Sequence, residues 1–133
     1  MQIGELAAAS GCQVETIRYY EREGLLPAPA RTAGNYRMYK AEHLERLAFI
    51  RHCRAMDMTL AEVRTLLHFK DVPDDNCSEV DRLLDVHIGK IGARLAELKA
   101  LQEQMIALRA RCTENLEARH CGILQGLAQS RPA

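Results

Sequence analysis

The sequence of 133 residues lacks the features that mark membrane, secreted and several enzyme classes of protein. No apolar run approaches the ~18 residues that a membrane-spanning helix needs. The first residues, MQIGELAAAS, do not join a basic stretch to a long apolar core. We therefore expect a cytoplasmic protein with no membrane partner. A Gly-rich phosphate loop and a Cys–His–Asn or Cys–His–Asp pattern are also missing, so we do not expect an enzyme.

An overall excess of charge is missing too, because 18 Lys and Arg balance 18 Asp and Glu. The charge is nevertheless uneven, since residues 16–54 hold eight Lys and Arg against four Asp and Glu, together with all four tyrosines. Arg forms paired hydrogen bonds with phosphate or guanine, and Tyr hydroxyls often bind phosphate. This stretch is suited to a polyanion such as DNA; a solvated basic face around a small aromatic core is the alternative.

Cysteines are few and odd in number, at five. An odd count without a secretory start does not indicate a disulfide framework, so we expect available thiols in a reducing compartment. Free cysteines are often simply small buried apolar side chains. We prefer that interpretation for Cys12 and Cys53, which lie in a predicted turn and a predicted helix.

Proline is absent from residues 77–112, where apolar residues and cysteines recur at every seventh position. The repeat positions are Cys77, Leu84, Ile91, Leu98, Met105 and Cys112. A repeat of this length predicts a coiled-coil helix over 77–111, whose apolar seam a partner must cover. Because 35 residues of helix extend about 50 Å, Cys77 and Cys112 of one chain cannot share a ligand. An antiparallel homodimer would bring Cys77 of one chain to Cys112 of the other.

Two short helices, over 3–9 and 14–23, are predicted at the start of the chain, with a Gly-containing turn between them. This is the pattern of a helix-turn-helix. The turn residues 33–35 between two extended stretches then predict a small hairpin, or wing. Helical spacing returns over 41–54, and Thr59 with Glu62 forms a capping box that begins another helix. We therefore expect a mainly α protein with a winged helix-turn-helix.

The run TIRYYEREGLL, followed by a wing of the form R-x-x-G-N-Y-R-x-Y, resembles the DNA-binding domain of MerR-family transcription regulators. The resemblance continues through the second helix pair, the long helix and the cysteine loop. It implies a homodimer that binds double-stranded promoter DNA with an over-long spacer. It further implies that an effector changes the DNA twist, so that RNA polymerase at the promoter becomes active.

The resemblance implies four parts of the chain. These are a winged helix-turn-helix over 1–40, a second helix pair and linker over 41–76, a dimerisation helix over 77–111, and a metal-binding loop with a tail over 112–133. By position, it places nine residues against DNA. They are Val14, Glu15, Thr16, Arg18 and Tyr19 on the recognition helix, and Arg31, Asn35, Tyr36 and Arg37 on the wing. Tyr20 suits either the core or a DNA contact, and Arg54 is a further candidate for a phosphate.

The resemblance also adds Cys121 to Cys77 and Cys112, which gives a three-thiolate metal site across the dimer interface. Thiolate sulfur selects soft or borderline ions, including Cd(II), Pb(II), Hg(II), Zn(II) and Cu(I). The start of a helix at Cys77 would favour the negative charge of such a site. His87 and His120 are additional candidate ligands, although a histidine at such a position often only packs against a neighbouring helix.

The stretches 73–77 and 121–124 look most like those of the Cd(II)- and Pb(II)-responsive members. Mercury-responsive members share the three cysteines, whereas Cys77 argues against the copper type. Zinc-type members carry paired cysteines, and Thr113 here follows Cys112 instead. We expect a regulator that activates metal efflux or sequestration genes in response to Cd(II) or Pb(II). An Hg(II) or Zn(II) response, or a thiol redox response, is the alternative.

Overall fold

The computed structural model describes residues 1–112, 114 and 117–129. Their contacts form two compact units, one over Met1–Leu83 and the other from Leu84 onward. The sequence suggested a division at residues 40, 76 and 111. That division was based on expected function rather than on compactness, and it stays an interpretation.

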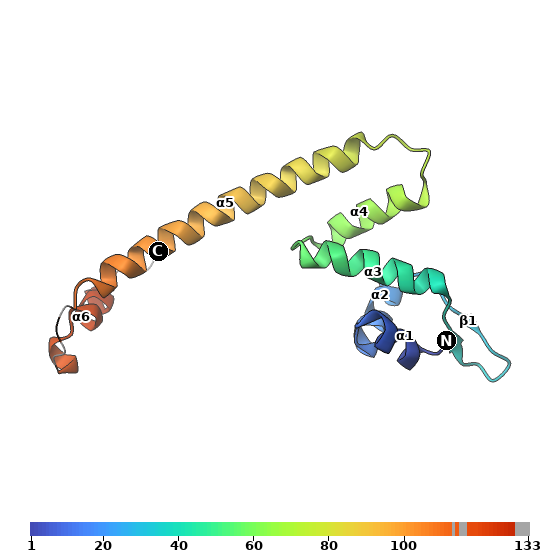
Figure 1. The fold of residues 1–133 in the computed structure, drawn as a ribbon, viewed down its shortest axis with the longest axis horizontal. Helices are drawn as coiled ribbons and strands as arrows, with labels where there is room; N and C mark the ends of the chain where they lie inside the picture. The colour runs from blue at the N-terminus through green and yellow to red at the C-terminus, as the bar shows by residue number, and fades with distance from the viewer. Residues whose placement is uncertain (113, 115–116, 130–133) are drawn as a thin grey trace. The chain divides into compact units, whose positions relative to one another are not determined.

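The first unit begins with the predicted helix-turn-helix, formed by α1 (Ile3–Ser10) and α2 (Val14–Arg22) (Figure 1). Gly11 ends α1 in the left-handed region, with φ of 72°, and its N–H donates to the carbonyl of Ala7 at 2.9 Å. Glycine adopts this conformation without the steric cost that other residues carry. The tight turn follows directly from this residue.

The wing is a two-stranded antiparallel sheet of β1 (Ala30–Arg31) and β2 (Arg37–Met38). Ala30 lies opposite Met38, and Arg31 lies opposite Arg37. Asn35 closes the turn with φ of 65°, a conformation that Asn tolerates better than most residues. The predicted wing is therefore confirmed, and its strands are very short.

Two further helices, α3 (Ala41–Ala55) and α4 (Leu60–Asp71), complete the helical part of this unit. The predicted capping box begins α4: Thr59 Oγ1 accepts from the Glu62 N–H at 3.2 Å, and Glu62 Oε1 accepts from the Thr59 N–H at 3.0 Å. These bonds satisfy two amide groups that the first turn of a helix leaves unpaired.

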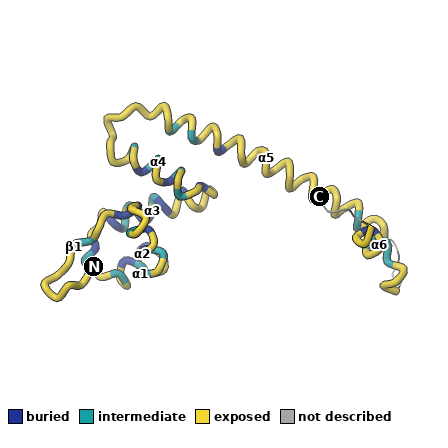
Figure 2. The backbone as a smooth tube through the Cα atoms, turned by 180° about the vertical axis from the view of Figure 1, so that it is seen from behind, coloured by how far each residue is buried: buried dark blue, intermediate teal, exposed yellow. Residues whose placement is uncertain are grey.

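The core of this unit collects apolar side chains from all four helices and the loop after α2 (Figure 2). Its most deeply buried members are Leu6, Ile17, Leu25, Leu47, Ile50, Val63 and Leu67. Each side chain of this kind contributes about 1.5–3 kcal/mol when it leaves water. This packing holds the recognition helix and the wing in one rigid frame.

The long helix α5 (Ser78–Arg109) has 32 residues, close to the predicted 77–111 (Figure 1). The side chain of Asn76 accepts from the Ser78 N–H at 2.8 Å and so caps its start. The heptad positions Leu84, Ile91, Leu98 and Met105 are 39–70% exposed in the single chain (Figure 2). Among the described residues, no helix is long and apolar enough to cross a membrane.

The chain then turns through a 3₁₀ helix, η1 (Ala118–His120), into α6 (Gly122–Gln129). The sequence indicated only a loop with a tail over 112–133. The structure has a short helix inside the loop and eight residues of helix after it. Thr113, which entered the comparison with zinc-type regulators, lies outside the described residues.

Candidate functional site

The outer face of α2 carries the residues expected to read DNA. Glu15 and Tyr19 are exposed, whereas Val14, Thr16 and Arg18 are half-buried. Ile17 and Tyr20 lie on the opposite face, in the core. Glu15 pairs with Arg18 at 3.2 Å, an exposed contact of a few tenths of a kcal/mol that a phosphate can readily replace.

Tyr20 had two possible roles, and the structure shows the packing role. Its side chain is 8% exposed and belongs to the hydrophobic core. Its carbonyl also accepts from the Leu25 N–H at 2.9 Å, which fixes the chain directly after α2. The location of Tyr20 therefore favours support of the recognition helix over a contact with DNA.

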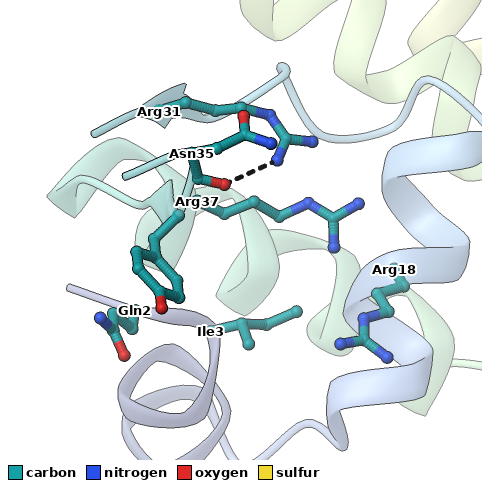
Figure 3. A pocket seen from close by; sticks show the side chains of 7 residues that line it. Gln2, Ile3, Arg18, Arg31, Asn35 and Arg37 are labelled. Carbon is teal, nitrogen blue, oxygen red and sulfur yellow. Dashed lines mark hydrogen bonds between the residues drawn. The ribbon is translucent and has the colours of Figure 1, made fainter. Parts of the chain in front are cut away.

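A basic cleft of about 250 Å³ lies between the wing and the helix-turn-helix (Figure 3). It is lined by Gln2, Ile3, Arg18, Arg31, Asn35, Tyr36 and Arg37. The three guanidinium groups come from three elements, α2, β1 and β2. Arg31 Nη1 donates to the carbonyl of Asn35 at 3.2 Å, and this bond holds Arg31 along the wing. The cleft is suited to an anionic group such as a backbone phosphate.

Glu21 joins the recognition helix to the wing beside this cleft. Its Oε1 accepts from the Tyr39 hydroxyl, and its Oε2 lies 3.8 Å from Arg37 Nε. The pKa of Tyr39 is raised to about 12, first by burial and then by its hydrogen bond to Glu21 and the negative charge of that carboxylate. Sequence reasoning gave Glu21 no role, because Tyr39 and Arg37 reach it only through the packing of the wing.

Three other arginines of the basic stretch serve the fold. Arg46 Nε donates to the carbonyl of Leu25 at 2.6 Å, and its guanidinium pairs with Asp71. The hydrogen bond from Arg46 lowers the pKa of Asp71. Arg51 donates to the carbonyl of Ser10 at the end of α1.

Arg54, a proposed phosphate contact, closes the turn after α3. Its Nη1 donates to the carbonyl of Met58 at 2.8 Å, although the residue is exposed. The positive charge of residues 16–54 is thus divided between structural bonds and the basic cleft. Composition alone could not make that division.

Cys112 and Cys121 lie together within one chain. The pKa of Cys121 is lowered, first by a hydrogen bond from the backbone N–H of Leu124, and also by Ile123 N–H, by the Cys112 thiol and by the charge of Arg109; burial acts in the opposite direction. Cys121 stands at the start of α6, where backbone N–H groups favour a thiolate. Two thiols placed in this way are of a kind suited to a soft metal ion.

Two glycines of α6 allow this arrangement. A Cβ at Gly122 would overlap the carbonyl oxygen of Arg111, and a Cβ at Gly126 would lie 2.9 Å from Leu108 Cδ1. A side chain at Gly122 would therefore force the start of α6 away from the end of α5, whereas one at Gly126 would have to displace the side chains of Arg111 and Leu108. The sequence contained this signal in the spacing Gly122–Gly126, but not its partner.

Cys77 stands immediately before α5 and is exposed. Its carbonyl accepts from the N–H groups of Val80 at 3.0 Å and Asp81 at 3.2 Å, so it too occupies a helix N-terminus. No group of three or more His, Cys, Asp or Glu side chains in the described part of one chain could hold a metal ion.

The remaining cysteines and histidines are separate from this pair. Cys53 is buried in the core, where burial raises the pKa of its thiol, and Cys12 is half-buried beside that core. Both positions agree with a packing role. His87 is buried on α5, while His120 is exposed in η1 and directly precedes Cys121.

A winged helix-turn-helix with a basic cleft, followed by a long helix with an uncovered seam, defines the class of helix-turn-helix regulatory proteins. Residues 1–70 match the family described as MerR HTH family regulatory protein, and residues 44–108 match that described as MerR, DNA binding. The chain belongs to the MerR family. Its relatives are transcriptional regulators rather than enzymes.

Three similar proteins illustrate the range of the family. The HTH-type transcriptional regulator ZntR homolog of Haemophilus influenzae is 47% identical over 88% of this chain and 87% of its own length. The crystal structure of PbrR691 from Ralstonia metallidurans CH34 with lead(II) is 50% identical, with a TM-score of 0.86, and covers 96% of this chain and 98% of its own. The regulator MerR of Bacillus megaterium MB1 with mercury(II) is 33% identical, with a TM-score of 0.72 and coverages of 97% and 100%.

Proposed function

We propose that this protein is a metal-sensing transcription regulator that activates metal efflux or sequestration genes when Cd(II) or Pb(II) binds. One observation carries the proposal: two thiols, those of Cys112 and Cys121, meet at a helix N-terminus in a chain that also carries a winged helix-turn-helix. Solved structures of similar regulators with lead(II) and mercury(II) support a soft metal as effector.

The DNA-binding unit would place α2 in the major groove and the wing on the backbone. Val14, Glu15, Thr16, Arg18 and Tyr19 are the proposed contacts of the helix. The wing would contribute the residues Arg31, Asn35, Tyr36 and Arg37. Arg54 is a weaker candidate because it closes the turn at Met58. Tyr20 supports α2 from the core.

The dimer would form through α5. Pairing two such helices antiparallel covers the exposed heptad seam and brings Cys77 of one chain to Cys112 and Cys121 of the other. Three thiolates would then hold the ion, and it would crosslink the two chains. Cys121 stands at the start of α6, where hydrogen bonds from backbone N–H groups lower the pKa of its thiol. His120 directly precedes Cys121, so it is a better candidate for a fourth ligand than the buried His87.

Activation requires that metal stabilise one of two dimer states over the other. Metal would clamp the end of one α5 and its α6 against the start of the partner helix. The angle between the two DNA-binding units would change, and with it the twist of an over-long promoter spacer. RNA polymerase would then use the promoter more effectively.

A promoter-reporter titration with Cd(II), Pb(II), Hg(II) and Zn(II) tests this function. We expect Cys77→Ser, Cys112→Ser and Cys121→Ser each to abolish the response and the thiolate-to-metal charge-transfer absorption. Cys12→Ser is the matched control, because Cys12 packs beside the core of the other unit, and should leave both intact. An unchanged response in Cys77→Ser would show that the shared site is wrong.

The contact of Cys112 with Cys121 also favours a second candidate, a thiol redox switch. Two thiols at this separation could be oxidised to a disulfide by a peroxide, which would be reduced to water or an alcohol. In that case, peroxide rather than metal would activate the reporter, and Cys77→Ser would leave the reporter response unchanged. The same titration also ranks Hg(II) and Zn(II) against Cd(II) and Pb(II).

A further inference from the structure

We propose that Glu21 is a positioning residue for DNA binding, which holds the guanidinium of Arg37 in the basic cleft where a backbone phosphate would lie. The inference rests on the DNA binding proposed above. Glu21 lies on α2 and Arg37 on β2, so their contact spans the two elements that would grip DNA. Glu21 itself would not touch the nucleic acid.

The carboxylate of Glu21 has a fixed orientation. Its side chain is 12% exposed, and its Oε1 accepts from the hydroxyl of Tyr39. Tyr39 is itself 3% exposed and packs edge-on against His43, with ring centroids 5.2 Å apart. His43 is buried as well and bonds to the carbonyl of Pro27 at 3.1 Å. One carboxylate oxygen is therefore anchored to the core, and the other faces Arg37.

Arg37 needs such a partner. It shares the cleft with Arg18 and Arg31, and three like charges repel one another in a partly desolvated site (Figure 3). A two-residue strand supplies few backbone bonds to resist that repulsion. A free Arg side chain also carries rotamer entropy, which binding must otherwise overcome. Glu21 offsets both costs before DNA arrives.

Substitution of Glu21 separates this role from simple electrostatics. Glu21→Gln removes a negative charge near the DNA, so electrostatics alone predicts tighter binding. A positioning role predicts weaker binding, because Arg37 is released from the cleft. The sign of the change therefore distinguishes the two accounts.

The test measures affinity against salt concentration for a fluorescent duplex selected from a random pool on the wild-type protein. For Glu21→Gln we expect about tenfold weaker binding, and a slope of log K against log salt reduced by about 0.9, the loss of one phosphate contact. Arg37→Ala should reduce the slope equally, and the double variant should bind no more weakly than Arg37→Ala.

Glu23→Gln is the matched control. Glu23 lies two residues after Glu21, directly after the end of α2, and is exposed. It pairs with Arg64 at 3.5 Å, away from the cleft. It loses the same charge and should bind DNA as tightly as wild type or slightly more tightly, with an unchanged slope. A misfolded variant would also bind DNA more weakly. Partial unfolding does not account for a salt slope that falls by one phosphate contact in a protein that still melts cooperatively.

Tyr39→Phe keeps the charge of Glu21 but removes its anchor, and should shift affinity and slope in the same direction as Glu21→Gln, though less. If Glu21→Gln binds as tightly as wild type or more tightly with an unchanged slope, the positioning role is overturned while the proposed function stands. If the wild-type protein selects no duplex from the pool, the proposed function fails first, and this inference fails with it.

Discussion

The two compact units of this chain treat their apolar side chains in opposite ways. In the first unit, Leu6, Leu47 and Ile50 are fully buried by their own chain. In the second, Leu95 and Met105 of α5 remain 62% and 70% exposed. Burial contributes about 25 cal/mol per Å² of apolar surface, so the first unit contains most of its own stabilisation. The second leaves its apolar seam exposed in the single chain.

The candidate sites follow the same division. The basic cleft draws all its residues from one unit of one chain. The proposed metal site has only two of its three thiols together, because Cys77 stands at the opposite end of α5 from Cys112. DNA contacts can therefore form locally, whereas metal binding would depend on how two chains are paired. A sensor built in this way responds to the geometry of the dimer.

A charge in the apolar seam of α5 should change the second unit most strongly. In Leu98→Glu, each chain places a carboxylate in the proposed interface, at a cost of several kcal/mol. We expect sedimentation to detect monomers that bind neither metal nor DNA tightly. The first unit should still melt cooperatively, because its core is complete within one chain.

Lys99→Glu is the control for that experiment. Lys99 is the exposed neighbour of Leu98 and lies outside the heptad repeat, so the variant should remain dimeric. Dimers of Leu98→Glu with wild-type affinity would show that α5 pairs through another face.

Mixing two inactive variants should test whether the metal site is shared between the two chains. Homodimers of Cys77→Ser and of Cys112→Ser/Cys121→Ser each lack a complete site. A mixed dimer would carry one intact site, formed by Cys77 of one chain and the cysteine pair of the other. Titration with Cd(II) after denaturation and refolding together should restore charge-transfer absorption to about one quarter of the wild-type amplitude, since about half of the dimers are mixed and each holds one of two sites. Absence of recovery, with dimerisation intact, would exclude a shared site.

The close approach of α6 to α5 should have a smaller effect. Gly122→Ala places a methyl group against the carbonyl of Arg111, so α6 must shift and Cys121 with it. We expect metal affinity to fall about tenfold, equivalent to roughly 1.4 kcal/mol, with little change in DNA affinity. Competition with a chromophoric chelator measures it.

Gly4→Ala is the counterpart in the first unit, where a Cβ at Gly4 meets nothing within 4 Å. It should leave metal affinity unchanged and stabilise α1 by up to about 1 kcal/mol. Equal metal affinities in the two variants would mean that the position of α6 does not control the site.

The element boundaries could be predicted because their signals are local. Thr59 and Glu62 lie within one turn, and the heptad repeat lies within one helix, so spacing alone identifies them. The contact between Glu21 and Tyr39 could not be predicted, because it joins residues 18 positions apart through the packing of the wing. For the same reason, composition could not separate Arg46, which bonds to Leu25 and Asp71, from the arginines of the cleft.

The last effect concerns Tyr39, and it should be confined to the first unit. Its pKa rises from 10.0 to about 12 on folding, mainly because burial disfavours the ionised ring. A raised pKa favours the protonated form of the folded protein. The resulting stabilisation is therefore fully present below pH 10 and is lost as the pH rises to about 12. In denaturant unfolding, the free energy of unfolding of the wild type should fall by about 2 kcal/mol more than that of Tyr39→Phe across that pH interval. The two proteins share every other group that titrates in this range, so the difference reports on Tyr39. At neutral pH, Tyr39→Phe should be less stable by about 1 kcal/mol, because Glu21 loses its donor. An identical alkaline profile in the two proteins would mean that the Tyr39 hydroxyl is hydrated rather than held by Glu21, and that the wing is not anchored through it.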